Sequence, residues 1–158
     1  MTTFIGDFPV KLDAKGRAAL PAAFKKQLSQ EAGERFVVKR DIFEECLVLY
    51  PMDEWLRQIE IIRSRVNPYN RNHNRFLRGF FRGTAELGLD ANSRLLLPRR
   101  LLDAVGIDKD VMMAGQDNKI EVWDKERYQQ LDEEEEDFAD LAQEILGNDE
   151  LPGMTENG

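Results

Sequence analysis

The sequence is poor in the residues that most often carry catalysis and metal binding. It contains one cysteine, Cys46, and one histidine, His73. A single cysteine excludes a disulfide within the chain, and this pair cannot supply the four ligands of a structural zinc site. Cys46 opens an apolar run, where a cysteine usually behaves as a small hydrophobic residue. No glycine-rich phosphate loop is present. The sequence therefore predicts no enzyme, no metal site, no cofactor and no small-molecule substrate.

Long hydrophobic runs are missing as well. No apolar stretch approaches the ~18 residues of a membrane-spanning helix. The first ten residues, MTTFIGDFPV, lack the basic start and the apolar run of a secretory signal. With 42% hydrophobic residues among 158, the chain can still bury a core, as one compact domain or two small ones. We therefore expect a cytoplasmic protein without a membrane partner.

Positive charge is scarce overall, and its distribution is uneven. The net charge is −8, but residues 124–158 alone hold 13 acidic and 2 basic residues, including six consecutive carboxylates at 132–137. Residues 57–100 hold 10 arginines and only three acidic residues. Such asymmetry indicates a basic working surface with an acidic appendage. Ordinary solvated helix faces would give the same composition, so charge alone leaves both interpretations open.

One stretch of ten residues occurs twice, and the rest of the chain is arranged around it. Residues 12–21 read LDAKGRAALP, and residues 89–98 read LDANSRLLLP, at an offset of 77 with six identities. A second match, at an offset of 73, aligns LVLYPMDEW at 47–55 with IEVWDKERY at 120–128. A repeat at a nearly fixed offset predicts two copies of one structural unit.

Both copies predict the same order of elements, because their patterns of apolar residues, prolines and turn residues agree. Each begins with a strand and a tight turn, and continues with a return strand, a short helix that starts at a proline, and two more strands. An amphipathic helix follows Pro51, and a very polar helix precedes the second copy. The predicted strands are 8–12, 17–20, 36–39 and 46–50 in the first copy and 84–89, 95–97, 111–114 and 119–123 in the second.

These patterns divide the chain into five segments. They are a first repeat at 8–55, connecting helices at 56–83, a second repeat at 84–127, an acidic amphipathic helix at 128–146 and a disordered tail at 147–158. The fold class that follows is mainly β with helices, or α+β, with a C-terminal helix.

The repeated Asp-x-x-x-Arg turn has a structural and a functional interpretation. In the structural one, Asp13 and Asp90 accept N–H groups of their turns, while Arg17 and Arg94 pair with carboxylates. In the functional one, the first hairpin enters the major groove of DNA, where Arg17 grips guanine in two bonds. Both interpretations remain open on the turn chemistry.

Other cations of the first repeat fit the functional interpretation. Lys15 lies in the turn itself, and Lys11 and Lys25, with the neighbouring Lys26, flank it. Lysines in such positions make phosphate contacts, which position a protein on DNA without reading its sequence.

The doubled motif carries a resemblance to a known family. The chain resembles the MraZ family of bacterial transcriptional regulators, which have two SpoVT-AbrB repeats. The resemblance rests on LDAKGR and LDANSR, each followed by Leu-Pro, and on LVLYPMDEW, FFRGTAELGLD and IEVWDKERY. It covers about residues 4–130 and implies a swapped-hairpin β-barrel of the AbrB, MazE and MraZ type, formed by the two tandem repeats.

The resemblance also implies partners and a function. It implies a ring-shaped homo-oligomer, associated with the nucleoid, that binds double-stranded DNA at tandem promoter repeats. The usual target is the promoter of the division and cell-wall gene cluster, where we expect the protein to act as a repressor. The DNA-contacting hairpin maps onto Lys15, Gly16 and Arg17. The second turn has Asn92 and Ser93 at the first two positions, so only Arg94 carries over.

A second function class remains open. Related barrels act as antitoxins, which hold a small toxin through an acidic C-terminal extension. This chain has such an extension, but it also has two repeats, whereas antitoxins of this type usually have one. The discriminating observation is a small protein that co-purifies with the chain.

Overall fold

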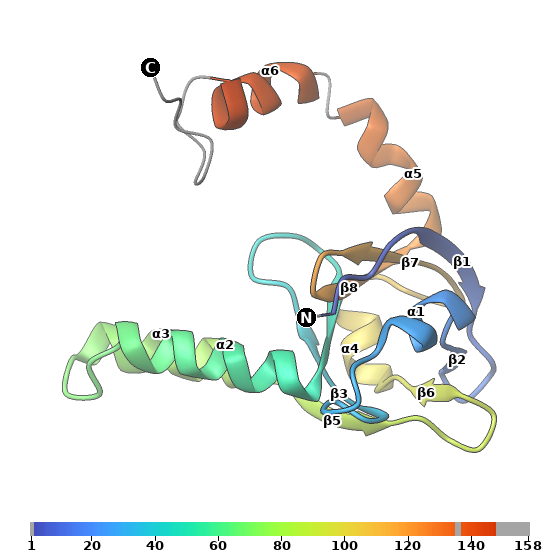
Figure 1. Ribbon diagram of the computed structural model, residues 1–158, viewed down its shortest axis with the longest axis horizontal. Coiled ribbons are helices and arrows are strands. Elements are labelled where there is room, and N and C mark those ends of the chain that lie inside the picture. The colour runs from blue at the N-terminus through green and yellow to red at the C-terminus, as the bar shows by residue number, and fades with distance from the viewer. Residues whose placement is uncertain (1, 135–136, 148–158) are drawn as a thin grey trace. The chain divides into compact units, whose positions relative to one another are not determined.

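The computed structural model describes residues 2–134 and 137–147 and divides the chain into two units, Met1–Lys125 and Glu126–Gly158. The first unit contains the elements of both repeats, in the predicted order (Figure 1). Those of the first repeat are β1 (Asp7–Lys11), β2 (Arg17–Ala19), α1 (Ala22–Gln27), β3 (Arg35–Arg40) and β4 (Leu47–Pro51). Those of the second repeat are β5 (Ala85–Gly88), β6 (Arg94–Leu96), α4 (Arg99–Ala104), β7 (Asp110–Gln116) and β8 (Lys119–Asp124).

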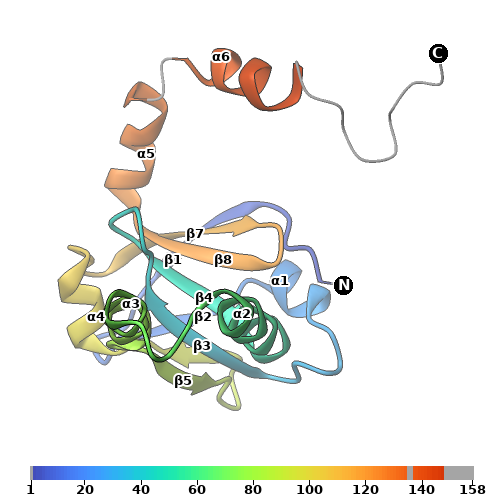
Figure 2. The ribbon, with the colours of Figure 1, turned by 90° about the vertical axis from the view of Figure 1, so that its left-hand side faces the viewer.

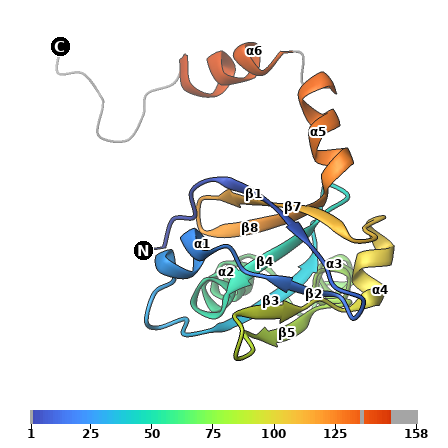
Figure 3. The ribbon, with the colours of Figure 1, turned by 90° about the vertical axis from the view of Figure 1, so that its right-hand side faces the viewer.

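The two repeats exchange strands with each other. Six strands form one antiparallel sheet in the order β1-β7-β8-β4-β3-β5, and β2 pairs with β6 in a second, two-stranded sheet (Figures 2 and 3). The first strand of each repeat therefore pairs with the third strand of the other repeat. The predicted α+β fold and the exchange of hairpins between repeats are confirmed.

The strand pairing follows a twofold pseudosymmetry. Val48 lies opposite Glu121 at the centre of the six-stranded sheet, and these two residues occupy the same position in the two repeats. Ala18 lies opposite Leu95 at the centre of the small sheet in the same way. The pairs on either side of these centres are related by the same pseudosymmetry. In the large sheet Leu47 pairs with Val122 and Leu49 with Ile120. In the small sheet Arg17 pairs with Leu96 and Ala19 with Arg94.

The expected barrel is not closed by hydrogen bonds, and this corrects the fold derived from the resemblance. Within the described residues, the six-stranded sheet ends at β1 on one side and at β5 on the other. Each edge strand runs into a tight turn, after which the chain leaves the large sheet and pairs in the small one. The result is an open antiparallel sheet with a separate β2–β6 ribbon, joined by side-chain packing.

The exchange of strands produces a single core. Its fully buried side chains come from both repeats and include Phe24 and Phe36 from the first and Leu95 and Leu102 from the second. Phe24 meets the ring of Phe4 edge-on, with ring centroids 5.5 Å apart. Since the two halves share one core, we expect neither half to fold stably alone.

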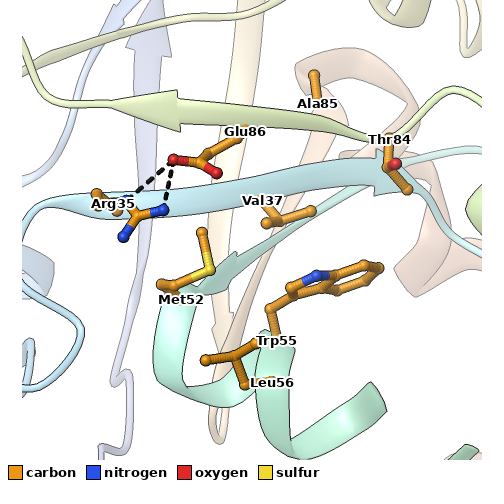
Figure 4. A pocket seen from close by; sticks show the side chains of 8 residues that line it. All are labelled: Arg35, Val37, Met52, Trp55, Leu56, Thr84, Ala85 and Glu86. Carbon is orange, nitrogen blue, oxygen red and sulfur yellow. Dashed lines mark hydrogen bonds and ion pairs between the residues drawn. The ribbon is translucent and has the colours of Figure 1, made fainter.

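Between the repeats, α2 (Met52–Arg65) and α3 (Arg71–Phe81) form a helical arm that projects from the sheet (Figures 1 and 2). Trp55 of α2 stacks on Phe80 of α3 at 5.7 Å between ring centroids, and the ammonium group of Lys39 lies 4.3 Å from the centroid of the same Phe80 ring. Figure 4 shows Trp55 at the base of the arm, beside Val37 of β3. The arm is therefore fixed to the sheet by aromatic packing and a cation–π contact.

The second unit consists of short helices. For 128–146 the sequence predicts one helix, whereas the structure has α5 (Lys125–Glu134), α6 (Phe138–Ala142) and a π-helical turn, η1 (Gln143–Gly147). Residues 135–136, between α5 and α6, lie outside the described residues. Of the predicted disordered tail, residues 148–158 lie outside the described residues. Among the helices that the structure describes, none has the length and apolar character needed to span a membrane.

Candidate nucleic-acid interface

The first turn is built around the carboxylate of Asp13. Its Oδ1 accepts the backbone N–H groups of Lys15 and Arg17, both at 2.9 Å, and its Oδ2 accepts the Nε–H of Arg17 at 2.6 Å. The backbone closes the same loop, since the N–H of Gly16 donates to the Asp13 carbonyl at 3.0 Å. One carboxylate therefore holds the turn closed and also fixes the stem of the arginine side chain.

The second turn repeats this geometry. Asp90 Oδ1 accepts the N–H groups of Asn92 and Arg94 at 2.8 and 2.9 Å, and Oδ2 accepts the Nε–H of Arg94 at 3.0 Å. Ser93 takes a φ of 58°, in the region where Gly16 has a φ of 90°. The second turn thus keeps the left-handed backbone of the first without its glycine, at some conformational cost.

The two turns are linked to each other across the pseudosymmetry. The N–H of Leu97 donates to the Gly16 carbonyl, and the N–H of Leu20 donates to the Ser93 carbonyl, both at 3.0 Å. Asp13 Oδ2 also lies 3.8 Å from Nη1 of Arg94. The structure therefore brings both motif arginines to one carboxylate, a convergence that the linear motif does not reveal.

The other predicted DNA contacts take different positions. Lys15 is exposed at the tip of the first turn. Lys25 of α1 donates from Nζ to Oγ of Ser93 at 2.6 Å, so a cation of the first repeat reaches the turn of the second. Lys11 is exposed at the end of β1, and no hydrogen bond or ion pair with the described residues ties it to either turn. Gly16 is buried, and a Cβ there would lie 2.9 Å from the Leu97 carbonyl oxygen.

One further cation at this surface is missing from the sequence-based prediction. Arg99, the first residue of α4, has its Nη2 only 3.9 Å from the place that a Cβ of Gly16 would occupy. Its position in the second repeat corresponds to Ala22 in the first, so the repeat itself gave no reason to select it. The clue lies in the basic pair that directly follows Pro98. We call Lys15, Arg17, Lys25, Arg94 and Arg99 the turn surface.

Both turn aspartates are held in the ionised form. The backbone N–H of Arg17 lowers the pKa of Asp13 to about 2, and the Arg17 side chain and the N–H of Lys15 act in the same direction. The N–H of Arg94 lowers the pKa of Asp90 in the corresponding way. Hydrogen bonds to a carboxylate favour its charged form, so both turns carry a permanent negative charge under their arginines at neutral pH.

Comparison with known proteins identifies the family. The family model of MraZ, described as "MraZ protein, putative antitoxin-like", matches residues 3–78 and 80–149. A protein of Christiangramia forsetii named transcriptional regulator MraZ is 42% identical over 98% of this chain and 100% of its own length. The chain belongs to the MraZ family.

Other members of the MraZ family agree over a similar range. The proteins named transcriptional regulator MraZ from Bacteroides fragilis and Flavobacterium psychrophilum are 39% and 40% identical. These matches cover 92% of both chains for the first and 94% of both for the second. The similarity to MraZ proteins therefore includes both repeats, the arm between them and most of the C-terminal unit.

Two other places in this MraZ-family chain have polar groups of chemical interest. At the base of the arm, Arg35 and Glu86 line a small pocket, but they pair with each other, Nη2 to Oε2 at 2.7 Å (Figure 4). Asp41, Cys46 and Glu121 offer ligand atoms that all lie within 4.8 Å of one another.

The contacts of the second group are those of a loop anchor. Asp41 accepts the N–H groups of Phe43 and Glu44, and Glu121 accepts the indole N–H of Trp123. Burial raises the pKa of the Cys46 thiol, which disfavours the thiolate that a metal would need. His73 likewise has a local role, because its Nδ1 accepts the N–H of Asn67 at 2.8 Å.

Proposed function

We propose that this member of the MraZ family is a sequence-specific DNA-binding transcriptional regulator that acts as a repressor. The observation that carries the proposal is the contact between Asp13 and Arg17 at the exposed first turn. Asp13 occupies Nε and fixes the stem, while the terminal nitrogens of Arg17 make no hydrogen bond with the residues that the structure describes. An arginine held in this way loses less conformational entropy when it binds a guanine in two bonds. The names of the relatives support the same class of function.

The turn surface supplies the remaining contacts in this proposal. Lys15, at the tip of the first turn, contacts a phosphate or a base edge, and Lys25 and Arg99 contact phosphates on either side. Arg94 lies next to Arg17 but has Asn92 where the first turn has Lys15. The first hairpin therefore makes the dominant contact, and the second hairpin makes the weaker one.

A single surface of this size is too small for tight and specific binding. We therefore propose that several copies form a ring and that their hairpins engage successive tandem repeats in a promoter. Matched spacing between hairpins and repeats would raise the overall affinity by roughly 10²–10⁴ over one hairpin. The target proposed from the family resemblance is the promoter of the division and cell-wall gene cluster, with the protein located on DNA in the cytoplasm.

The test is binding of the full chain to its own upstream DNA, with the repeats intact and scrambled. We expect Arg17→Ala to reduce binding to intact repeats to the level of scrambled DNA, because a bidentate guanine contact gives about 1–3 kcal/mol of discrimination per site. Arg65→Ala, which removes an exposed arginine of α2, is the matched control and should bind like the wild type. Equal binding by Arg17→Ala and wild type would mean that the hairpin does not read the repeats.

A second candidate function is supported by the family description, which contains the word antitoxin-like, and by the acidic C-terminal unit. In this alternative the C-terminal unit binds a small basic toxin, while the repeats provide the scaffold. Affinity purification of the full chain from its natural host tests it. A stoichiometric small basic partner, lost when residues 126–158 are removed, would favour this function.

A further inference from the structure

Most of the arginine-rich stretch at 57–100 takes no part in the turn surface, which uses only its Arg94 and Arg99. Four of its arginines, Arg71, Arg75, Arg78 and Arg82, follow one another at spacings of four, three and four residues. At 100° per residue they fall within an arc of roughly 60° on α3 and its C-terminal cap. Phe80, which is buried against α2, points to the opposite side of the same helix. We call these four residues the arginine stripe.

The charges of the arginine stripe are not neutralised within the described residues. All four side chains are exposed, and none forms an ion pair or hydrogen bond with the part of the chain that the structure describes. On α2, by contrast, Arg57 pairs with Glu54 and Arg63 pairs with Glu60, both at 3.0 Å. The stripe therefore has the character of a surface that binds an anionic partner.

A cleft beside the stripe adds apolar surface to this charge. It lies between α3, α4 and the loop that joins β3 to β4, and Arg75, Arg82 and Arg100 line it. Phe43 and Phe76, which are 88% and 44% exposed, line the same cleft. A suitable partner is therefore a segment of protein that combines carboxylates with apolar side chains, because a bare phosphate backbone would leave these rings uncovered.

The position of the stripe also argues against DNA as its partner. Within the first unit, the arm and the two turns project from opposite ends of the sheet region (Figure 1). DNA that is read by the turns of one copy therefore does not lie along the arginine stripe of that copy.

The C-terminal segment of the chain has the complementary chemistry. Residues 132–137 are six consecutive carboxylates, and Phe138, Leu141 and Ile145 follow at spacings of three and four residues. These three side chains are at least half exposed, with exposed fractions of 65%, 50% and 56%. We propose that residues 132–146 of one copy bind the arginine stripe and the adjoining cleft of a second copy.

Such an exchange explains how copies could associate. Each chain carries one stripe and one acidic segment, so each copy can donate its segment to one neighbour and receive that of another. A head-to-tail contact of this kind closes into a ring when the rotation between neighbours permits. The proposal rests on the self-association proposed above, but it does not depend on DNA binding.

Energy transfer between dyes on separate full-length copies tests the contact. One copy is labelled at Asn72→Cys, beside the stripe, and the other at Gln143→Cys, while buried Cys46 stays unlabelled. We expect transfer at low salt that weakens as salt screens the charges. Arg75→Glu with Arg78→Glu in the first copy should weaken the association roughly tenfold, and so should Glu134→Lys with Glu135→Lys in the second.

Combining the two charge-reversed copies should restore the transfer, because lysines then face glutamates. Arg65→Glu with Lys109→Glu, which reverses two exposed cations outside the arginine stripe, its cleft and the turn surface, is the matched control and should leave the transfer unchanged. Transfer that survives reversal of the stripe overturns the proposal. A second control puts both dyes on one chain and dilutes it in unlabelled protein. If transfer is seen only in that sample, the stripe binds the acidic segment of its own chain and the proposal is overturned.

A DNA measurement on the same variants separates this proposal from the proposed function. If reversal of the stripe weakens binding to random-sequence DNA and lowers its salt dependence while the transfer is unchanged, the stripe is a phosphate surface and the proposal fails. If the wild-type protein fails to bind promoter repeats but its transfer follows the expected pattern, the proposed function fails and the contact between copies stands.

Discussion

At the scale of single residues, Asp13 combines two tasks in one carboxylate. It closes the first turn through two backbone N–H groups and orients Arg17 through Nε. Both tasks need the ionised form, because only a carboxylate accepts hydrogen bonds at both oxygens without donating one. Asp13 is therefore the residue where the stability of the fold and the geometry of the candidate site are coupled.

Low pH should remove the contribution that Asp13 makes to the stability of the fold. The folded-state pKa of Asp13 lies at about 2, below its value of about 3.9 in an unfolded chain. Its contribution to stability is therefore complete above about pH 5 and is lost as the pH falls toward 2. We expect Asp13→Asn to lower the free energy of unfolding near neutral pH, and the difference from wild type to shrink below about pH 4.

Urea unfolding of both proteins across this pH range measures the effect. Asp108→Asn, which changes an exposed carboxylate outside the turns, is the control and should behave like the wild type. A constant difference between Asp13→Asn and wild type at every pH would contradict the role assigned to the ionised carboxylate.

Gly16 meets two constraints, a positive φ and a close neighbour. We expect Gly16→Ala to lower the free energy of unfolding by more than the ~1–2 kcal/mol that the left-handed conformation alone costs. The additional loss arises because the new Cβ would lie 2.9 Å from the Leu97 carbonyl oxygen. This clash can be relieved only by a shift of the backbone. Denaturant unfolding measures both effects together.

Gly33→Ala separates the conformational cost of a positive φ from the steric cost of the added Cβ. Gly33 has a φ of 61° and nothing within 4 Å of the Cβ position, so it reports the conformational cost alone. Equal losses for the two variants would show that the turns are not packed against each other as described.

At the scale of elements, the arm depends on one aromatic side chain. Phe80 stacks on Trp55, contacts Phe76 and Phe81, and lies under Lys39. We expect Phe80→Ala to lower the free energy of unfolding by about 3–4 kcal/mol, since its removal leaves a cavity between both helices and the sheet. Phe43→Ala removes a ring that is 88% exposed and should change stability by less than about 0.5 kcal/mol. Thermal unfolding of the three proteins tests the prediction.

The elements themselves were accessible from the sequence, but their pairing was not. Local patterns predict strands such as Phe36–Lys39 and helices such as the one after Pro51, because side-chain periodicity is a property of neighbouring residues. The partner of β1 is β7, about a hundred residues away in the chain, and no local pattern specifies it. The family resemblance implied the exchange of hairpins, but it also implied a closed barrel, which the open sheet corrects.

The candidate site shows the same division. The motif gave Asp13 and Arg17, whose contacts lie within five residues of sequence. The bond from Lys25 to Ser93 and the position of Arg99 beside Gly16 depend on the packing of one repeat against the other. Such contacts follow from the tertiary arrangement and leave no trace in residue spacing.

At the scale of the whole molecule, the shared core predicts that the halves fold only together. A chain cut between Asn67 and Pro68 separates β1, β3 and β4 from their partners β7, β5 and β8. We expect each fragment alone to lack stable structure and the mixture to regain the sheet as a 1:1 complex. Circular dichroism and size-exclusion chromatography of fragments 1–67 and 68–158 measure this.

A cut at the boundary between units is the control for that experiment. Removal of residues 126–158 leaves every pairing of the two sheets intact, so residues 1–125 should keep their strand content. Cooperative unfolding of either fragment, 1–67 or 68–158, in isolation would contradict the shared core.

The pseudosymmetry described for the sheet has a consequence for the DNA that such a protein would recognise. Two identical chains related by a true twofold axis have no preferred direction, and they match palindromic sites. Here the two halves belong to one chain, and their turns differ, with Lys15 and Gly16 in one and Asn92 and Ser93 in the other. The molecule therefore has a polarity along the line through its turns. A regulator with this polarity would suit repeats that all run in one orientation and would distinguish them from inverted ones.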